Sequence, residues 1–387
     1  MKKICILGST GSIGVSLLNI LKKDLKKTKI ELLTANIDYK KILNQAIFFK
    51  VKNIIITDYK SYLKVKKMCK NKNINVYNNY FSLNKIFKNK KIDYTMNAIA
   101  GLSGLEPTLN IIPHTKKIAI ANKESIICGW SLILKKLKIN KTEFVPVDSE
   151  HFSIFSLIKG TNKNNIKKVY ITASGGPFLS WPLHKFKFIR IKDALKHPNW
   201  KMGKKITIDS STMMNKVFEI IEAKKIFNYE YNKLSIITHP KSYVHAIVQF
   251  KNGLTKMLIH DTTMIIPIFN TLYPNYEKHI TPKKLNFDLM NNLDFKNIDP
   301  KKFPVIKILD FLPKKDSLFE TILVAANDEL VNLFLQKKIN FSDISTNLLK
   351  IVKIREFDKF KKIRPKNVDE INKLSKYVSL KVNSICV

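Results

Sequence analysis

The first part of the chain alternates short apolar runs rich in β-branched residues with longer stretches in which apolar residues recur at helical spacing. Such alternation is typical of a parallel sheet whose strands are joined by crossover helices. The predicted strands span residues 3–7, 30–34, 53–57, 94–99, 117–121 and 143–147. We therefore expect an α/β domain of residues 1–147 built on a parallel sheet.

The pattern changes after residue 147. Further strands are predicted at residues 168–172, 234–238 and 245–250, and a helix is predicted from about Ser211. A stretch rich in Gly, Pro and Trp, at about residues 174–204, is too long for a simple connection, and loops of this size are often lids. These features predict a central α+β domain of residues 148–290 that carries a flap.

From about residue 300 the apolar residues recur at helical spacing. One stripe follows Ser317, which would cap the helix, and a second stripe comes near the C-terminus. The stripes consist of Leu318, Ile322, Ala325, Ala326, Leu330, Leu333 and Phe334, and of Val368, Ile371, Leu374 and Val378. Residues 300–387 are therefore predicted to form a C-terminal helical bundle.

Composition narrows the class of protein. The length of 387 residues predicts two or three domains, and the hydrophobic content of 45% is typical of globular proteins. No apolar run approaches the thickness of a bilayer, and the N-terminal run reaches Gly8 too soon for a signal peptide. The four cysteines lack metal or redox spacing. We expect a cytoplasmic protein with reduced thiols and no membrane segment.

The formal charge of +39 would suit a nucleic-acid-binding protein. The lysines, however, recur along the whole chain and form neither an aromatic-interleaved cluster nor a known binding module. Solvated surface lysines in a chain of biased composition explain this distribution better. We expect no nucleic-acid partner.

Residues 8–14, with the sequence GSTGSIG, follow the first strand directly and open a helix. In this setting Gly8, Gly11 and Gly14 would allow a tight turn, close approach of the backbone to a pyrophosphate and close packing of the helix, as in Rossmann-like sheets that bind dinucleotides. A purely structural turn is the alternative.

Asn36 follows the second strand where an acid would hold a ribose 2′-hydroxyl, and this favours NADP over NAD.

No cation directly follows that second strand. Ile37 and Asp38 stand where an arginine or a lysine would bind a 2′-phosphate, and Lys40 and Lys41 are the nearest cations. The preference for NADP therefore rests on the missing acid alone.

Asp148 and Glu150 stand two residues apart where the strand of residues 143–147 ends. Side chains two apart in a strand point the same way, so these carboxylates would repel each other unless they are solvated, share a proton or hold a cation. Hard oxygen ligands suit Mg²⁺ or Mn²⁺ better than zinc. The pair is compatible with a metal site and with a solvated strand end.

Residues 209–219 form the densest polar group of the chain. In the predicted helix, Asn215 and Glu219 would be one turn apart with Lys216 beside them. Ser210, Asn215 and Lys216 could then grip a phosphate, and Glu219 would add a third carboxylate for a metal. The alternative is an amphipathic helix with a solvated side.

Polar residues also follow two other predicted strands. Asn122-Lys123-Glu124 stands at the sheet edge where open α/β folds bind ligands, although a surface ion pair would look the same. The flap begins at Ser174 and later contains His197 and Trp200. By themselves, such a histidine is more often a loop hydrogen-bonder and such a tryptophan a packing residue.

Together these segments resemble the 1-deoxy-D-xylulose 5-phosphate reductoisomerase family over essentially the whole chain. Two stretches depart from the family pattern, residues 36–38, where the family usually has Gly-basic-Asn, and residues 260–267, which the family has in a more polar version. The matching segments, in the family's order, are residues 8–14, 122–125, 146–151, 174–178, 197–203, 209–219, 239–245 and 325–329.

The resemblance implies an activity and a set of ligands. The enzyme would convert 1-deoxy-D-xylulose 5-phosphate, a sugar phosphate, to 2-C-methyl-D-erythritol 4-phosphate in the non-mevalonate isoprenoid pathway. It would use NADPH and either Mn²⁺ or Mg²⁺, residues 148–290 would be the catalytic domain, and the chain would form a homodimer.

The resemblance also implies roles for single residues. Asp148, Glu150 and Glu219 would hold the metal, and with Lys123 they would form the catalytic group. The substrate would be bound by Lys123, Ser149, Ser174, His197, Trp200, Ser210, Asn215 and Lys216. The cofactor would be bound by Gly8, Thr10, Gly11, Ser12, Ile13, Asn36, Asn122, Glu124 and Gly203.

Two rival functions explain less of the sequence. Another NADP-dependent dehydrogenase of a phosphorylated substrate would use the glycine turn but would leave the three carboxylates without a role. An RNA-binding protein would explain the lysines alone.

Overall fold

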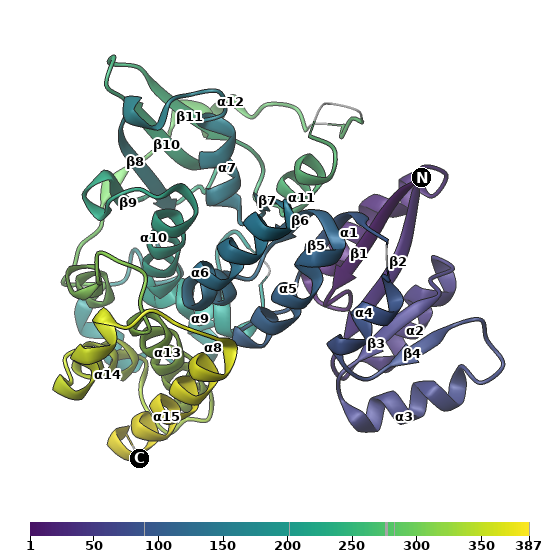
Figure 1. Cartoon of the computed structure of the whole chain (residues 1–387). Helices are drawn as coiled ribbons and strands as arrows, with labels where there is room; N and C mark the ends of the chain where they lie inside the picture. Colours follow the sequence, from purple (N-terminus) through teal and green to yellow (C-terminus); the bar gives the residue numbers. More distant parts are fainter. Residues whose placement is uncertain (89, 201, 275–277, 282, 387) are drawn as a thin grey trace. The chain divides into compact units, whose positions relative to one another are not determined.

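The computed structural model describes residues 1–88, 90–200, 202–274, 278–281 and 283–386, and these divide into two compact units (Figure 1). The first unit comprises the described residues of Met1–Ile126, Ser131–Asp148 and Met264–Thr281. The second unit comprises those of Ile127–Trp130, Ser149–Thr263 and Pro282–Val387. The division into three domains stays a prediction, and residues 264–281 group with the first unit rather than with the central segment that precedes them.

The first unit is built on a seven-stranded parallel sheet with the strand order β4-β3-β2-β1-β5-β6-β7. Every strand predicted in this part of the sequence is present, because each contains apolar residues that are buried in the sheet. The strands are β1 Lys2–Leu7, β2 Thr28–Ala35, β3 Asn53–Ile56, β4 Asn75–Tyr77, β5 Ile92–Asn97, β6 Thr115–Ile120 and β7 Glu143–Pro146.

Helices follow these strands as crossover connections. They are α1 Ser12–Leu21, α2 Tyr39–Phe48, α3 Tyr59–Met68, α4 Leu83–Ile86, α5 Leu105–Ile111 and α6 Lys123–Asn140. A further helix of this unit, α11 Ile265–Leu272, packs on α1. Its buried residues Ile268 and Leu272 join the same apolar core as Ile6 of β1 and Leu17 of α1. Helix α11 is thereby anchored to the sheet of the first unit.

The second unit contains a mixed five-stranded sheet with the order β11-β10-β8-β9-β12. Strands β8 and β9 are parallel, and the other pairs are antiparallel. The strands are β8 Ile166–Ala173, β9 Leu234–Thr238, β10 Val244–Phe250, β11 Thr255–Ile259 and β12 Lys296–Asn297. The fold class predicted from the sequence, a Rossmann-like parallel sheet, an α+β part and C-terminal helices, is therefore confirmed.

Helices cover this second sheet and follow it in the chain. They are α7 Ser149–Leu157, α8 Ile191–Ala194, α9 Lys204–Thr212, α10 Met214–Phe227 and α12 Phe287–Asn291, then α13 Phe319–Leu335, α14 Phe341–Ile351 and α15 Val368–Cys386. Helix α13 packs against both α14 and α15, as the apolar stripes predicted. In the described part of the chain, none of the helices combines the length and apolarity that crossing a bilayer requires.

The predicted helix start near Ser211 is wrong. Helix α9 ends at Thr212, Met213 adopts a left-handed conformation with φ of 70°, and α10 begins at Met214. A left-handed residue ends a helix, and it is usually glycine or asparagine, so the sequence carried no signal for this break. Ser210 consequently lies on a different helix from Asn215, Lys216 and Glu219.

The flap predicted at residues 174–204 connects β8 to α9 and is partly anchored. The ring of the buried Phe178 packs edge-on against Trp181 and against Phe341 of α14. Phe186 joins the same aromatic cluster. The cluster fixes the early part of the segment, so any closing motion would be confined to the later part around His197 and Trp200.

The glycine turn between β1 and α1 is packed too closely for a side chain at Gly14. A Cβ atom built there would lie 2.5 Å from the carbonyl oxygen of Gly8 and 2.6 Å from Cα of Ser9. At Gly11 the nearest atoms to a built Cβ are 3.6 Å away, and φ is an ordinary −74°. A Cβ atom would therefore clash with the backbone at Gly14 but would make only ordinary contacts at Gly11.

We predict that Gly14→Ala lowers the free energy of unfolding by about 1–3 kcal/mol, because the backbone of the turn must move. Gly11→Ala is the matched control, and its effect should stay within about 1 kcal/mol, because its Cβ meets only ordinary contacts. Urea denaturation of both variants makes the comparison. Equal effects at the two positions would contradict the packing described here.

Candidate active site

The glycine turn presents backbone N–H groups at the N-terminus of α1. Gly8 has φ of 78° and Gly11 is the residue that precedes the helix. Among the described residues, no side chain caps this helix end, and Gly11 and Ser12 are exposed. Helix N-termini of this kind bind phosphate groups, because the N–H groups and the helix dipole both favour negative charge.

The residues after β2 are engaged in local structure. The side-chain oxygen of Asn36 accepts a hydrogen bond from the hydroxyl of Thr57 at 3.0 Å. Asp38 caps α2, where its carboxylate accepts from the backbone N–H of Lys41 at 3.1 Å. Ile37 is 65% exposed. The carboxylate of Asp38 is therefore engaged at the helix end rather than directed to a ribose.

Asn122 organises the start of α6 in the first unit. Its side-chain oxygen accepts from the backbone N–H of Ser125 at 2.7 Å, and its amide group donates to the carbonyl oxygens of Gly101 and Ile99. Lys123, the first residue of the helix, lies with its ammonium 3.1 Å from the carboxylate of Asp148, and both side chains are largely buried. The sequence motif thus links the loop after β5 to the end of β7.

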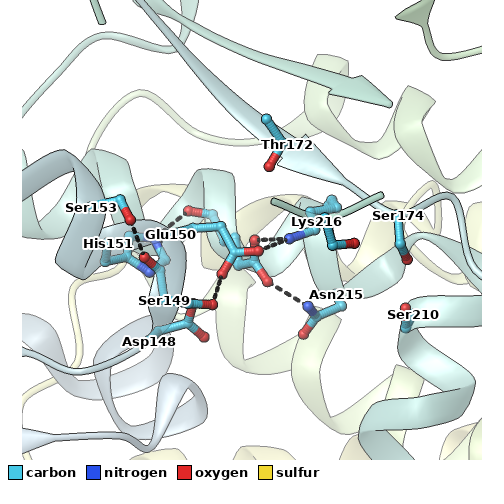
Figure 2. A network of polar contacts seen from close by, with 12 residues as sticks. Asp148, Ser149, Glu150, His151, Ser153, Thr172, Ser174, Ser210, Asn215 and Lys216 are labelled. Atoms are coloured by element: carbon cyan, nitrogen blue, oxygen red, sulfur yellow. Dashed lines mark hydrogen bonds and ion pairs between the residues drawn. The ribbon is translucent and has the colours of Figure 1, made fainter. Parts of the chain in front are cut away.

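The carboxylates of Glu150 and Glu219 meet at one ammonium in the second unit. The Nζ atom of Lys216 contacts Oε1 of Glu150 and lies 2.6 Å from Oε2 of Glu219. One oxygen of each carboxylate lies within 4.8 Å of the other. In Figure 2 the Lys216 side chain points toward that of Glu150. Helices α7 and α10 therefore bring two acids and one base together.

Burial alone would lower the pKa of Lys216, but the attraction of Glu150 and Glu219 outweighs it and raises the pKa above its ordinary value. Neutral donors complete the cluster. Asn215 donates to Oε1 of Glu219, and the hydroxyl of Ser149 donates to Oε2 of Glu150 at 2.6 Å. Each carboxylate therefore has a neutral hydrogen-bond donor beside the ammonium of Lys216.

His151 and Glu222 were not assigned a role from the sequence. The ring Nε2 of His151 donates to the backbone carbonyl of Glu219 at 2.9 Å, and Nδ1 lies 3.4 Å from Oε2 of Glu222. Both side chains are buried. This contact ties α7 to α10 and so fixes Glu150 beside Glu219. The signal in the sequence was a second acid one helical turn after Glu219, on a helix that is otherwise buried.

Ser174 and Ser210 face each other (Figure 2), and His197 bridges them. Its Nε2 lies 3.3 Å from the hydroxyl oxygen of Ser174 and 3.1 Å from that of Ser210. Its Nδ1 accepts from the backbone N–H groups of Asn199 and Trp200 at 3.1 and 3.0 Å. Because Nδ1 is an acceptor, the neutral ring carries its proton on Nε2 and can donate it to a hydroxyl.

The flap tip is held by further contacts in the second unit. The amide of Asn199 donates to the carbonyl oxygen of Pro240 at 2.7 Å and lies 2.9 Å from the hydroxyl of Ser242. The Trp200 ring packs edge-on against that of His245, with 6.1 Å between the centroids. Gly203 is the exposed residue that precedes α9. His197 and Trp200 are thus positioned rather than free loop residues.

We predict a measurable pH effect from His197. Burial, followed by the positive charge of Lys216, lowers the pKa of His197 to about 4. In the unfolded chain the pKa is about 6.5, so between these values the unfolded state binds the extra proton and the native state loses stability as the pH falls. From pH 7 to pH 5, the urea midpoint of the wild type should therefore fall further than that of His197→Asn.

An NMR titration of the ring gives an independent reading of the same pKa. A His197 resonance that titrates near pH 6.5, or equal losses of stability in the two proteins, would contradict the environment described above.

Three family models match the chain in order. The model described as 1-deoxy-D-xylulose 5-phosphate reductoisomerase matches residues 4–129, its C-terminal domain model matches residues 144–227, and a further model, described as DXP reductoisomerase C-terminal domain, matches residues 260–379. The chain is 63% identical over 388 residues to 1-deoxy-D-xylulose 5-phosphate reductoisomerase of Pelagibacter ubique, with 100% of both chains covered. It is 40% identical to the protein of that name from Clostridium kluyveri, covering 89% of this chain and 90% of the relative.

Solved structures of 1-deoxy-D-xylulose 5-phosphate reductoisomerases are also similar to this chain. The Zymomonas mobilis 1-deoxy-D-xylulose 5-phosphate reductoisomerase in complex with NADPH superposes with a TM-score of 0.88 at 29% identity, covering 100% of this chain and 99% of that one. A DOX-P reductoisomerase in complex with NADPH, fosmidomycin and magnesium gives a TM-score of 0.88 at 28% identity, covering 100% of this chain and 97% of that one.

Proposed function

Because the chain belongs to the 1-deoxy-D-xylulose 5-phosphate reductoisomerase family, we propose that the acid pair around Lys216 is its metal site and that the serines bridged by His197 belong to its phosphate site. The chain is an NADPH-dependent oxidoreductase that converts 1-deoxy-D-xylulose 5-phosphate to 2-C-methyl-D-erythritol 4-phosphate in the non-mevalonate isoprenoid pathway. The observation that carries the assignment of the site is the sharing of one buried ammonium by Glu150 and Glu219.

The donor set fits a hard divalent ion. Glu150 and Glu219 supply carboxylate oxygens close to one another, and Asp148, which directly precedes Ser149, supplies the third. Oxygen-only ligand sets suit Mg²⁺ and Mn²⁺, and the family structures include complexes with magnesium. When bound, such an ion acts as a Lewis acid toward the oxygen atoms of the substrate. Lys123 pairs with Asp148 and partly balances the charge of that carboxylate.

Lys216 has two possible partners in this proposal. Its ammonium balances the charge of Glu150 and Glu219, and a divalent ion would compete with it for both acids. The ammonium would then be available for the phosphate of the substrate. The observed contacts of Lys216 are with carboxylates and do not test a contact with phosphate. That contact therefore remains part of the proposal.

Besides Lys216, the phosphate would be bound by three kinds of neutral donor. Ser174 and Ser210 offer hydroxyls, Asn215 offers an amide, and the neutral ring of His197 offers an N–H group. Trp200 beside His197 would cover the bound substrate and exclude water, and Ser149 would contact the oxygenated end of the substrate. Remote binding of a phosphate supplies energy that orients the reacting carbons.

The cofactor site lies at the glycine turn in this proposal. The backbone at Gly8, Thr10, Gly11, Ser12 and Ile13 would bind the pyrophosphate of NADPH at the N-terminus of α1. The other proposed contacts are Asn36, Asn122, Glu124 and Gly203. The fit rests on the uncapped helix and on a turn too tight for a Cβ atom at Gly14.

Two further proposals rest on family membership alone. The chain would act as a homodimer, and it would be located in the cytoplasm. Sedimentation at micromolar concentration tests the first, because a dimer has twice the mass of the 44.8 kDa chain.

We predict that Glu150→Gln and Glu219→Gln each weaken Mn²⁺ binding at least about a hundredfold, because each loses a charged ligand whose neutral isostere binds the ion poorly. Turnover should fall to a comparable degree, while NADPH binding should be unchanged. Calorimetric titration with Mn²⁺ measures the first effect, and Glu230→Gln, on an acid that is 68% exposed, is the control.

Full Mn²⁺ affinity in Glu150→Gln or in Glu219→Gln would show that the substituted acid is not a ligand. Activity of either variant in the presence of a strong chelator would have the same meaning.

A further inference from the structure

The end of β2 carries no cation in the three residues that follow it. In dinucleotide-binding sheets this strand end lies beside the adenosine ribose, where a base recognises the 2′-phosphate that distinguishes NADP from NAD. Here Asn36 bonds to Thr57, Ile37 is 65% exposed and Asp38 caps α2. Another residue must therefore neutralise a 2′-phosphate if this chain prefers NADPH.

The side chain of Lys41, in the first turn of α2, extends to the glycine turn. Its Nζ atom donates to the carbonyl oxygen of Thr10, in the glycine turn, at 2.7 Å. The side chain is exposed, so its ammonium keeps donors available for a ligand. The charge thus lies between the start of α2, just beyond the end of β2, and the turn that would bind the pyrophosphate.

The neighbouring contacts show that α2 is fixed against the turn. Gln45, one helical turn after Lys41, donates from its amide to the carbonyl oxygen of Ser9 at 3.0 Å and accepts from the hydroxyl of Ser9 at 2.8 Å. Residues four apart share one face of a helix, so the face that carries Lys41 is the face that contacts the turn. The backbone N–H of Ser9 in turn donates to the carbonyl oxygen of Thr34 in β2 at 2.9 Å.

We propose that Lys41 recognises the 2′-phosphate of NADPH in this chain, in place of a base directly after β2. The inference rests on the proposed cofactor site at the glycine turn. Lys40 does not serve, because successive helix residues point about 100° apart and Lys40 therefore lies on a different face from Gln45. The carboxylate of Asp38 lies nearby, but its bond to the backbone N–H of Lys41 commits it to the helix end.

The experiment is a pair of fluorescence titrations, with NADPH and with NADH, on metal-free protein without substrate. Lys41→Met keeps most of the length of the side chain and removes its charge, and Lys40→Met is the matched control. We expect Lys41→Met to bind NADPH about 10- to 100-fold more weakly, as the loss of one charge-assisted contact predicts, and to bind NADH within about twofold of the wild type. Lys40→Met should bind both cofactors as the wild type does.

Several results would overturn the inference. Unchanged NADPH affinity in Lys41→Met would show that the ammonium does not contact the phosphate. Equal weakening of NADPH and NADH would assign Lys41 to the pyrophosphate or to the packing of α2, and thermal unfolding of the variant separates these two explanations. Failure of the wild type to bind NADPH would refute the proposed cofactor site, and the inference with it.

A second variant keeps the proposal open to test if Lys41→Met is unstable. Adding Ile37→Arg to Lys41→Met places a cation directly after β2, and it should restore the preference for NADPH over NADH. Rescue would support a charge contact at the 2′-phosphate, because a purely structural role of Lys41 could not be replaced from position 37. A double variant that binds the two cofactors equally would count against the proposal.

Discussion

The attraction between one ammonium and two carboxylates holds the candidate metal site of the second unit together. Glu150 and Glu219 are largely buried, and two like charges at this separation repel strongly unless a cation lies between them. Lys216 supplies that cation, and its own burial would be unfavourable without the two acids. Buried ion clusters of this kind add little net stability, so we infer that this one is retained for function.

The surrounding contacts are consistent with this electrostatic requirement. His151 joins α7 to α10 and so keeps Glu150 and Glu219 in register. Lys216 also helps to keep His197 neutral, because a second positive charge nearby would be unfavourable. A neutral ring can accept from the backbone of the flap with one nitrogen and donate toward the serine hydroxyls with the other. The phosphate and metal parts of the proposed site are thus linked through the charge of Lys216.

The sequence predicted the parts of the fold whose signal is local. Six of the seven strands of the parallel sheet were recognisable because each contains a buried apolar run, and the glycine turn was recognisable because strand, turn and helix follow one another. Strands β4, β11 and β12 were missed, since β4 has three residues, β12 has two, and β11 is mostly exposed. The helix break at Met213 was missed because nothing in the side chain of methionine favours a left-handed backbone.

The same limit applies to the candidate site. Sequence motifs identified the candidate site residues Asp148, Glu150, Glu219, Lys216 and the serines. The side chains that each of them contacts could not be identified in this way. The sharing of Lys216 between two acids depends on how α7 packs against α10, and the reach of Lys41 to the glycine turn depends on how α2 packs against β2. Contacts between distant segments carry no periodic pattern, so they become visible only in three dimensions.

We propose that Glu150 and Glu219 form a cation site in which Lys216 serves as the balancing charge. The most direct test is anomalous diffraction from crystals of this protein grown with Mn²⁺. We expect a manganese peak bonded to both glutamates and to Asp148, with the ammonium of Lys216 displaced from between the two acids. A peak located elsewhere, with Lys216 still in contact with both glutamates, would contradict it.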